Sequence, residues 1–326
     1  MNQKNFGETS ETMPPLYRLL RKGVAVQRRA ARKIVHLALG PSPWTESQEK
    51  SHVVPPKPRF CQYMGNKTLL TETDFGRKIY LDSEDLSLTP HIAYEGRWEP
   101  WVTDFFIREI KQGDVFIDIG ANCGFFTILA AHLVGPQGFV IAFEPQKKLA
   151  TLVGNSLMIN GFDSYSRVET VAIGEEVGEA TLGHVGTLRG SASLTPGFGD
   201  GTTASDQVRV RPLDHAIFDI SQSAGRPIVP TIMKVDVEGY EFNVWKGMKA
   251  VLSECRDLTI LLEFAPVRYE GLGQKASDFV NEMVAEGFTL SVLRHDSTER
   301  PLAGNTVEEI MQSDHCVDLV LRRRSS

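Results

Sequence analysis

Short apolar runs alternate with helix-like patterns along the chain from about residue 110 onward. The apolar runs carry few polar interruptions, which is typical of strands buried on both faces, and they lie at 115–120, 139–145, 167–174, 231–239 and 258–264. Apolar positions at helical spacing predict the helices between them, at 124–134, 146–160, 213–222 and 240–252. Strands joined by helical crossovers indicate a doubly wound α/β domain with a mostly parallel sheet.

The pattern changes toward the C-terminus. A helix is expected at 275–286, followed by strands at 288–295 and 315–324. No helical crossover is expected between these two strands, so we predict that they pair in antiparallel fashion.

Residues 174–211 break the alternation with eight glycines and few large apolar side chains. We interpret this segment as a glycine-rich insertion with short strands that lies over one end of the sheet. Long loops inside compact domains often cover active sites, although a plain surface insertion fits the same composition.

The N-terminal part differs in charge from the rest of the chain. The formal net charge is −6, but residues 1–60 contain eleven Lys and Arg against four Asp and Glu (+7), and the remainder contains 24 against 37 (−13). Residues 16–39 can form a basic amphipathic helix, and the proline-rich stretch that follows is interpreted as a linker. The helix can be a solvated extension, a peripheral contact with an anionic membrane, or a contact with another macromolecule.

Composition narrows the class of protein. The four cysteines are widely spaced and form no CxxC or Cys/His cluster, which argues against a disulfide framework or a structural zinc site. No apolar stretch is long enough to span a bilayer, and the N-terminus lacks the core of a secretory signal. We expect a cytoplasmic protein, with peripheral membrane contact left open.

The first candidate site follows the strand at 115–120, where Asp118, Gly120, Asn122 and Gly124 form the turn into the next helix. Glycine at 120 permits a tight turn, and glycine at 124 permits close approach of a ligand. The spacing is not the GxGxxG of dinucleotide-binding proteins. A carboxylate here would repel a diphosphate and could receive an amine, which favours S-adenosylmethionine as the cofactor.

Glu144 ends the next apolar run, 24 residues after Gly120. An acid at the tip of the second strand can accept hydrogen bonds from both ribose hydroxyls. The alternative is an acid stabilised by the dipole of the following helix.

Lys234, Asp236 and Glu238 interrupt the apolar run at 231–239. Alternation along a strand would place all three on one side. Because buried ionisable groups are costly unless they pair or serve a site, we expect a catalytic cluster, with Asp236 as base or orienting group and Lys234 as its partner.

VFIDIGANCGFFTILAA (115–131), VIAFEPQ (140–146) and IMKVDVEGYEFNVWKGM (232–248) together resemble the FkbM-type family of class I S-adenosylmethionine-dependent methyltransferases. The resemblance implies a Rossmann-like, seven-stranded sheet with an antiparallel last strand. It places Asp118, Gly120, Asn122 and Gly124 on the cofactor loop, Glu144 on the ribose, and Glu99 near the methionine end. It also makes Asp236 and Glu238 an acidic pair. We divide the chain into a basic extension (1–60), a lead-in (61–110) and a methyltransferase domain (111–326).

The family usually methylates hydroxyls, so a sugar, glycan, lipid-linked or small natural-product acceptor is expected. His184 and His215 are alternative bases to Asp236, and no metal site is expected because a third ligand beside Asp236 and Glu238 is missing.

The acidic main domain argues against a nucleic-acid substrate. Two alternatives are a non-catalytic or membrane-recruited protein on the same fold and an NAD-dependent oxidoreductase; the oligomeric state is left open.

Overall fold

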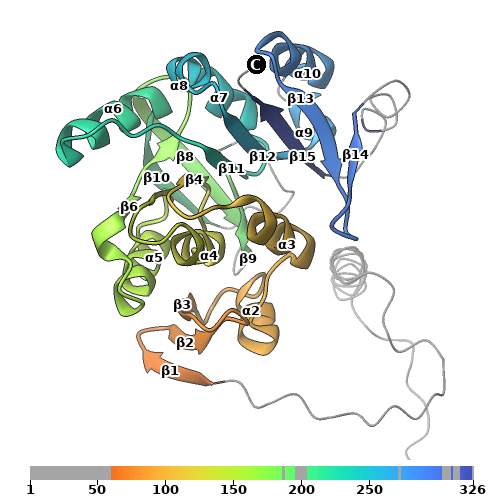
Figure 1. Cartoon of the computed structure of the whole chain (residues 1–326). Coiled ribbons are helices and arrows are strands. Elements are labelled where there is room, and N and C mark those ends of the chain that lie inside the picture. Colours follow the sequence, from red (N-terminus) through yellow and green to blue (C-terminus); the bar gives the residue numbers. More distant parts are fainter. Residues whose placement is uncertain are drawn as a thin grey trace, which may run out of the picture. The chain divides into compact units, whose positions relative to one another are not determined.

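The computed structural model describes residues 60–185, 188–194, 204–270, 273–302, 310 and 316–324 (Figure 1). The predicted basic helix at 16–39 and its linker lie outside the described residues. No helix in the described part of the chain is long and apolar enough to cross a membrane.

A mixed sheet forms the centre of the fold, with the strand order β14-β13-β15-β12-β11-β4-β5-β6. Its parallel core is β4 (Val115–Ile119), β5 (Phe139–Phe143), β6 (Ser166–Glu169), β11 (Ile232–Val235) and β12 (Leu258–Phe264). As predicted, β15 (Val317–Arg323) runs antiparallel to β13 (Thr289–Leu293), and it is also antiparallel to β12. The α/β class is confirmed, but β14 (Glu299–Pro301) adds an eighth strand among the described residues.

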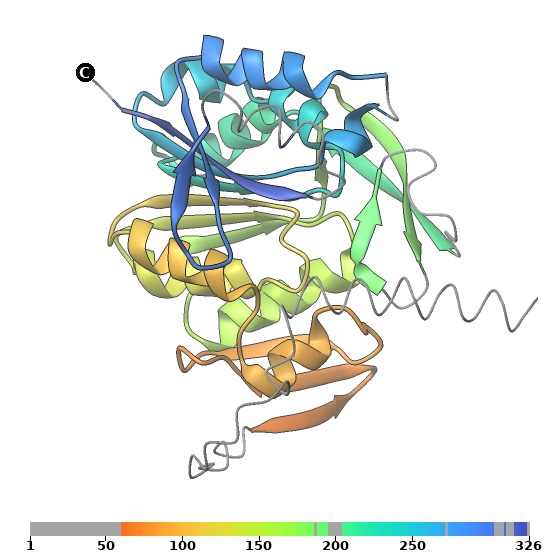
Figure 2. The same cartoon turned by 90° about the vertical axis from the view of Figure 1, so that its right-hand side faces the viewer.

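Helices cover both faces of this sheet (Figures 1 and 2). On one face lie α3 (Pro100–Glu109), α4 (Phe125–Val134) and α5 (Lys147–Ile159). On the other lie α6 (Leu213–Ala224), α7 (Glu241–Lys246), α8 (Lys249–Glu254), α9 (Pro266–Glu270) and α10 (Ala276–Ala285). Two hydrophobic clusters correspond to these layers: alternate β4 residues divide between them, with Phe116 in the cluster of α3–α5 and Ile117 in the other. Burial on both faces explains the continuous apolar runs.

A small antiparallel sheet precedes α3. It consists of β1 (Cys61–Gly65), β2 (Thr68–Glu72) and β3 (Lys78–Asp82), followed by α2 (Thr89–Glu95). The Tyr80 amide donates a 2.9 Å hydrogen bond to Oγ of Ser156, and Lys148 pairs with Asp82 at 2.6 Å. Both contacts join β3 to α5.

The glycine-rich insertion forms a second sheet of order β7-β10-β8-β9, with β7 (Ala172–Ile173), β8 (Gly178–Val185), β9 (Leu188–Ser193) and β10 (Ala204–Arg211). The strand expected at 167–174 is therefore divided between two sheets, with β6 following the short 3-10 helix η1 (Asp163–Tyr165). The helix expected at 240–252 is also divided into two helices, α7, which ends before Gly247, and α8, which begins at Lys249. A Cβ at Gly247 would lie 2.0 Å from the carbonyl oxygen of Gly174, so only glycine permits this close approach of the two segments.

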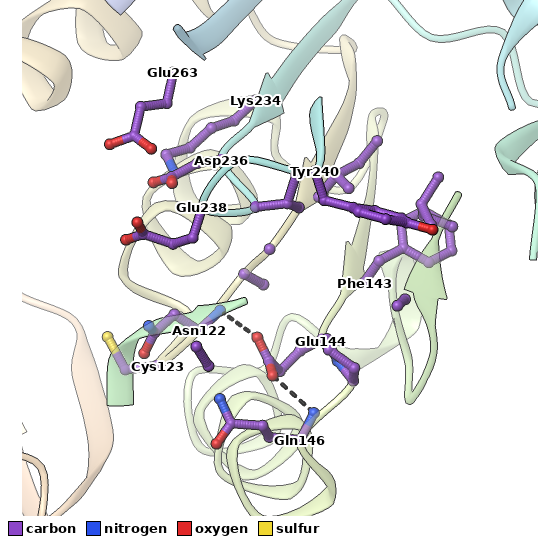
Figure 3. Close-up of a pocket in the computed structure, with 18 of the residues that line it drawn as sticks. Asn122, Cys123, Phe143, Glu144, Gln146, Lys234, Asp236, Glu238, Tyr240 and Glu263 are labelled. Carbon is purple, nitrogen blue, oxygen red and sulfur yellow. Dashed lines mark hydrogen bonds and ion pairs between the residues drawn. The ribbon is translucent and has the colours of Figure 1, made fainter. Parts of the chain in front are cut away.

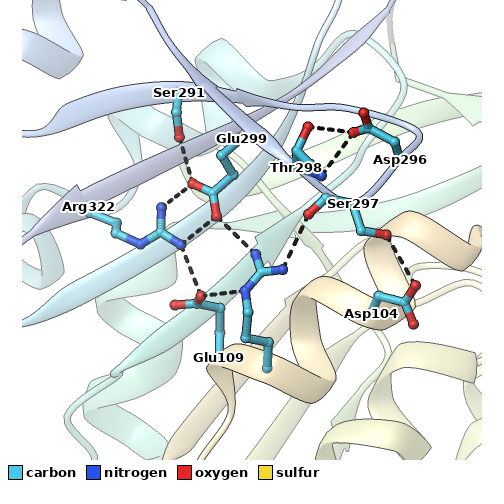
Figure 4. Close-up of polar contacts among 9 residues, drawn as sticks. Asp104, Glu109, Ser291, Asp296, Ser297, Thr298, Glu299 and Arg322 are labelled. Atoms are coloured by element: carbon cyan, nitrogen blue, oxygen red, sulfur yellow. Dashed lines mark hydrogen bonds and ion pairs between the residues drawn. The ribbon is translucent and has the colours of Figure 1, made fainter.

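An ion-pair network joins the β13–β14 hairpin to α3 (Figure 4). Glu299 accepts hydrogen bonds from Arg322, Arg108 and Ser291, and Arg322 also pairs with Glu109 at 3.1 Å. The network fixes the position of α3, whose first turn begins at the edge of the site described next.

Candidate active site

A pocket opens at the carboxyl ends of β4, β5 and β11, where a doubly wound sheet binds its ligands (Figure 3). The loop after β4 contributes Gly120 to Cys123, and the end of β5 contributes Phe143 to Gln146. The second sheet closes one side with Leu182, Ala192 and Leu194, so the glycine-rich insertion does contribute to the site.

Of the two predicted glycines, only Gly120 lines the pocket. Gly120 has φ +83°, and a Cβ there would lie 1.9 Å from the carbonyl oxygen of Asp236. Gly124 has φ +82°, and its Cβ would lie 2.8 Å from the side chain of Val153. Glycine is required at both positions by packing within the protein, which corrects the expectation that Gly124 admits a ligand.

Asp118 lies beneath the loop and does not line the pocket, contrary to the expectation that it receives the amine of the cofactor. It is 1% exposed and accepts a 2.6 Å hydrogen bond from Oγ1 of Thr127. Burial raises its pKa, and Lys234 opposes that shift. Asp118 therefore acts beneath the pocket: it accepts the hydrogen bond of Thr127 and is a buried negative charge near Lys234.

Glu144 joins the loops that follow β4 and β5 (Figure 3). Its Oε2 accepts a hydrogen bond from the amide of Asn122, and its Oε1 accepts one from the amide of Gln146, both 2.8 Å long. Burial raises the pKa of Glu144 to about 7, against the two amide hydrogen bonds that lower it. The carboxyl lines the pocket and keeps acceptor capacity for a ligand, because each oxygen has two lone pairs.

Lys234 and Asp236 form an ion pair of 2.7 Å at the end of β11. The expectation that Lys234, Asp236 and Glu238 share one side of a strand is wrong, because β11 ends at Val235 and Glu238 has φ +55°. A turn nevertheless brings all three to the pocket. Lys234 is 5% exposed, and its Nζ lies 5.1 Å from the centre of the Phe126 ring. Burial would lower the pKa of Lys234, but Asp236, Asp118 and Glu99 raise it above its ordinary value.

Sequence reasoning missed a second charged group beside this pair. Arg268 on α9 contacts Glu238 and Glu263 through the same nitrogen, at 2.8 Å each. Burial and the carboxylate neighbours raise the pKa of Glu238 to about 7 and that of Glu263 well above its ordinary value, while Arg268 lowers both. The signal for Glu263 was its position as the one charged residue in the apolar run LTILLEF.

Glu263 also supplies the third carboxylate that the sequence reading lacked. Asp236, Glu238 and Glu263 offer ligand atoms within 4.8 Å of one another, a distance that suits a divalent cation. Lys234 pairs with Asp236, and Arg268 pairs with both Glu238 and Glu263, so the two cations offset part of the negative charge of the cluster.

Glu99, the residue before α3, also lines the pocket. Its backbone is left-handed (φ 40°, ψ 77°), and its side chain does not cap the helix. Burial raises the pKa of Glu99 to about 8; Asp318, Asp236 and Glu238 add to the shift, and Lys234 opposes it.

Of the two histidines considered as bases, His215 does not join this group. His215 on α6 lines a separate surface groove with Lys246 and Glu175. The side chain of His184 lies outside the described residues.

Comparison with known proteins identifies the class of the chain. The model of the methyltransferase FkbM domain matches residues 118–296, more than half of the chain. The chain belongs to this family and is an S-adenosylmethionine-dependent methyltransferase.

Several solved structures are similar to it. An S-adenosylmethionine-dependent O-methyltransferase from Thermotoga maritima is 14% identical, covering 79% of this chain and 77% of its own, with a TM-score of 0.33. An O-methyltransferase from Bacillus cereus in complex with S-adenosylhomocysteine is 12% identical, covering 74% and 84%, with a TM-score of 0.37. The precorrin-6y C5,15-methyltransferase from Geobacter metallireducens is 13% identical, covering 69% and 86%, with a TM-score of 0.36.

Proposed function

We propose that the protein transfers a methyl group to a hydroxyl oxygen of a sugar, glycan, lipid-linked or small natural-product acceptor. The observation that supports this proposal most directly is the set of carboxyl groups at the end of the pocket away from Glu144. Asp236, Glu238, Glu263 and Glu99 all line that end. Carboxylates accept hydrogen bonds from hydroxyl groups, and several of them side by side suit an acceptor with more than one hydroxyl.

The cofactor fits the other part of the pocket. Glu144 would accept hydrogen bonds from the ribose hydroxyls, and Gly120 and Asn122 would line the path of the methionine chain. The apolar wall of Phe143, Ile173 and Leu182 would cover the adenine. When bound, S-adenosylmethionine supplies a methyl group on a positively charged sulfur.

The protein has three tasks in such a reaction. It must align the acceptor oxygen with the methyl group, exclude water, and accept the proton of the hydroxyl. Asp236 is suited to the first task because Lys234 holds its carboxylate at 2.7 Å. The second sheet is suited to exclude water, since Leu182 and Leu194 face the pocket beside the cofactor loop.

The experiment that tests the proposal uses S-adenosylmethionine labelled with ¹³C at the methyl group. Purified full-length protein would be incubated with separated small-molecule, glycan and lipid fractions of its source. We expect the label to appear as a methyl ether. Label on nitrogen or carbon, or label carried mainly by protein or nucleic acid, would refute the proposed acceptor class.

A further inference from the structure

We propose that Glu99, rather than Asp236, is the residue that removes the proton from the acceptor hydroxyl. This inference rests on the proposed O-methyltransferase function and assigns the catalytic base within it. Four observations lead to it: the contacts of the neighbouring carboxylates, the backbone at Glu99, its anchoring, and the charges around it.

The other carboxylates at this end of the pocket are already engaged. Asp236 is held by the ammonium of Lys234, and a proton on Asp236 would leave that buried ammonium without its closest counter-ion. Glu238 and Glu263 share Arg268. Asp318 accepts a 2.8 Å hydrogen bond from the indole of Trp101. In the described part of the chain, the side chain of Glu99 has neither a hydrogen bond nor an ion pair, although it lines the pocket.

The backbone directs this free carboxyl away from the helix that follows. An acidic side chain immediately before a helix usually caps the first amides, but Glu99 makes no such hydrogen bond. It also adopts φ 40°, which is unfavourable for a residue with a Cβ and recurs at functional sites. The conformation places the carboxyl against the pocket.

Two sets of contacts keep Glu99 in this position. The amide of Thr103 donates to the carbonyl of Glu99 at 2.9 Å, and Oγ1 of Thr103 donates to the carbonyl of Trp98 at 2.6 Å. At the far end of α3, the network around Glu299 ties Arg108 and Glu109 to the sheet (Figure 4). A base must be held in this way to meet its substrate in the correct geometry.

The charges around Glu99 also suit a base. They come from Lys234 on β11, Asp236 and Glu238 in the turn that follows, and Asp318 on β15, while Glu263 on β12, which also lines the pocket, is paired with Arg268. Burial and the three carboxylates raise the pKa of Glu99 to about 8, and Lys234 opposes them. A carboxylate with a raised pKa binds a proton more strongly than an ordinary glutamate and is a better base near neutral pH.

The step balances as follows. The O–H bond of the acceptor breaks and its proton moves to the Glu99 carboxylate. The oxygen uses its electron pair to form a bond with the methyl carbon, and the electrons of the C–S bond stay on sulfur. The products are the methyl ether, S-adenosylhomocysteine and a protonated Glu99, which releases its proton to solvent.

The main test compares Glu99→Gln with Glu95→Gln, an exposed acid four residues earlier on α2, and with Asp236→Asn. The substrate is the methyl-accepting fraction found in the labelling experiment. We expect kcat/KM of the wild type to rise with pH and level off above about 8. Glu99→Gln should lower kcat by about 10²–10⁴-fold, remove that rise, and leave the Kd for S-adenosylmethionine nearly unchanged. Glu95→Gln should match the wild type. Asp236→Asn should lower kcat but keep the rise with pH.

Two further measurements keep the inference open to refutation. Glu99→Gly suits the positive φ and should fold, and added formate should restore part of its activity but none of that of Asp236→Gly. Without any acceptor, NMR of protein labelled at the glutamate carboxyl carbons should show one signal, absent in Glu99→Gln, that titrates near pH 8.

A persistent pH dependence in Glu99→Gln, or a titration at the ordinary glutamate value, would overturn the assignment. A large rise in the Kd for S-adenosylmethionine with kcat preserved would show instead that Glu99 binds the cofactor. Label on nitrogen or carbon refutes the proposed function, an outcome distinct from these.

Discussion

The amide of Asn122 donates a hydrogen bond of 2.8 Å to Oε2 of Glu144, so that the loops following two neighbouring strands share one buried carboxyl. The contact gives Glu144 two tasks at once. It accepts hydrogen bonds from the amides of Asn122 and Gln146, and it presents the remaining lone pairs to the pocket.

Replacing Glu144 should therefore affect cofactor binding more than turnover. We expect Glu144→Ala to raise the Kd for S-adenosylmethionine by about 10- to 100-fold, since one side chain supplies several hydrogen bonds of about 1 kcal/mol or more. At saturating cofactor the rate should change much less. Isothermal titration and initial rates separate the two effects. Glu282→Gln, an exposed acid on α10, is the control, and an unchanged Kd in Glu144→Ala would contradict the ribose assignment.

A second prediction concerns Gly124 and Val153. Gly124→Ala places a methyl group 2.8 Å from the Val153 side chain at φ +82°, whereas Gly161→Ala meets nothing within 4 Å at φ +72°. Both should lose about 1 kcal/mol from the backbone conformation. Gly124→Ala should lose about 1–3 kcal/mol more from overpacking, and Val153→Ala should restore part of that loss. Urea unfolding gives the stability of the wild type, of the two glycine variants and of the Gly124→Ala/Val153→Ala double variant. Equal losses for the two glycine variants would disprove the steric argument.

The third prediction concerns the shared contact of Arg268. Arg268→Met leaves Glu238 and Glu263 together without their cation, so we expect a loss of about 3–5 kcal/mol. The loss should be larger at pH 8 than at pH 5, because the carboxyl of Glu238, with a pKa of about 7, ionises in that range. Adding Glu263→Gln should recover part of the stability. Arg211→Met removes an exposed ion pair with Asp219 and should cost less than about 1 kcal/mol.

The fourth prediction concerns the pH dependence of stability without ligand. The pKa values of Glu99 (about 8), Glu144 (about 7) and Glu238 (about 7) lie above the ordinary 4.5. Between pH 4.5 and 8 the folded protein therefore holds protons that the unfolded chain has released, so these groups make stability fall as pH rises. Burial and the neighbouring Arg77 lower the pKa of His132 below its ordinary 6.5, so this residue acts in the opposite direction.

Single variants isolate each contribution. Glu144→Gln should flatten the fall between about pH 4.5 and 7, and Glu99→Gln should flatten it up to about pH 8. Thermal unfolding at unit pH steps gives the comparison with the wild type. A variant whose Tm follows the wild type in parallel across this range would show that its carboxyl titrates normally.

Periodicity predicted the layered sheet because burial on both faces leaves a clear signal in the sequence. The runs around Phe116 and Ile141 are apolar throughout, and the helices that cover them begin and end within a few residues of expectation. Short elements without apolar content, such as Glu299–Pro301, leave no such signal. Contacts distant in sequence also left no signal, and the close approach of Gly247 to Gly174 between the two halves of a predicted helix is an example.

The candidate site was predicted in the same uneven way. Glu144 and Asp236 were found because they end apolar strands. The burial of Asp118 against Thr127 could not be read from the sequence, since it depends on where the loop turns. Arg268 was not predicted because it is one arginine among many in the sequence. Its ion pairs with Glu238 and Glu263 depend on how α9 follows β12.

The second sheet has a consequence for engineering. Leu182 on β8, Ala192 on β9 and Leu194 directly after β9 reach the pocket from outside the central sheet. A library restricted to these three positions would reshape one wall of the pocket while leaving Glu144, Asp236 and the two hydrophobic clusters of the central sheet unchanged. Because Leu182 is buried in the hydrophobic cluster of the second sheet, substitutions that conserve its volume should change which molecules the pocket accepts at the least cost in stability.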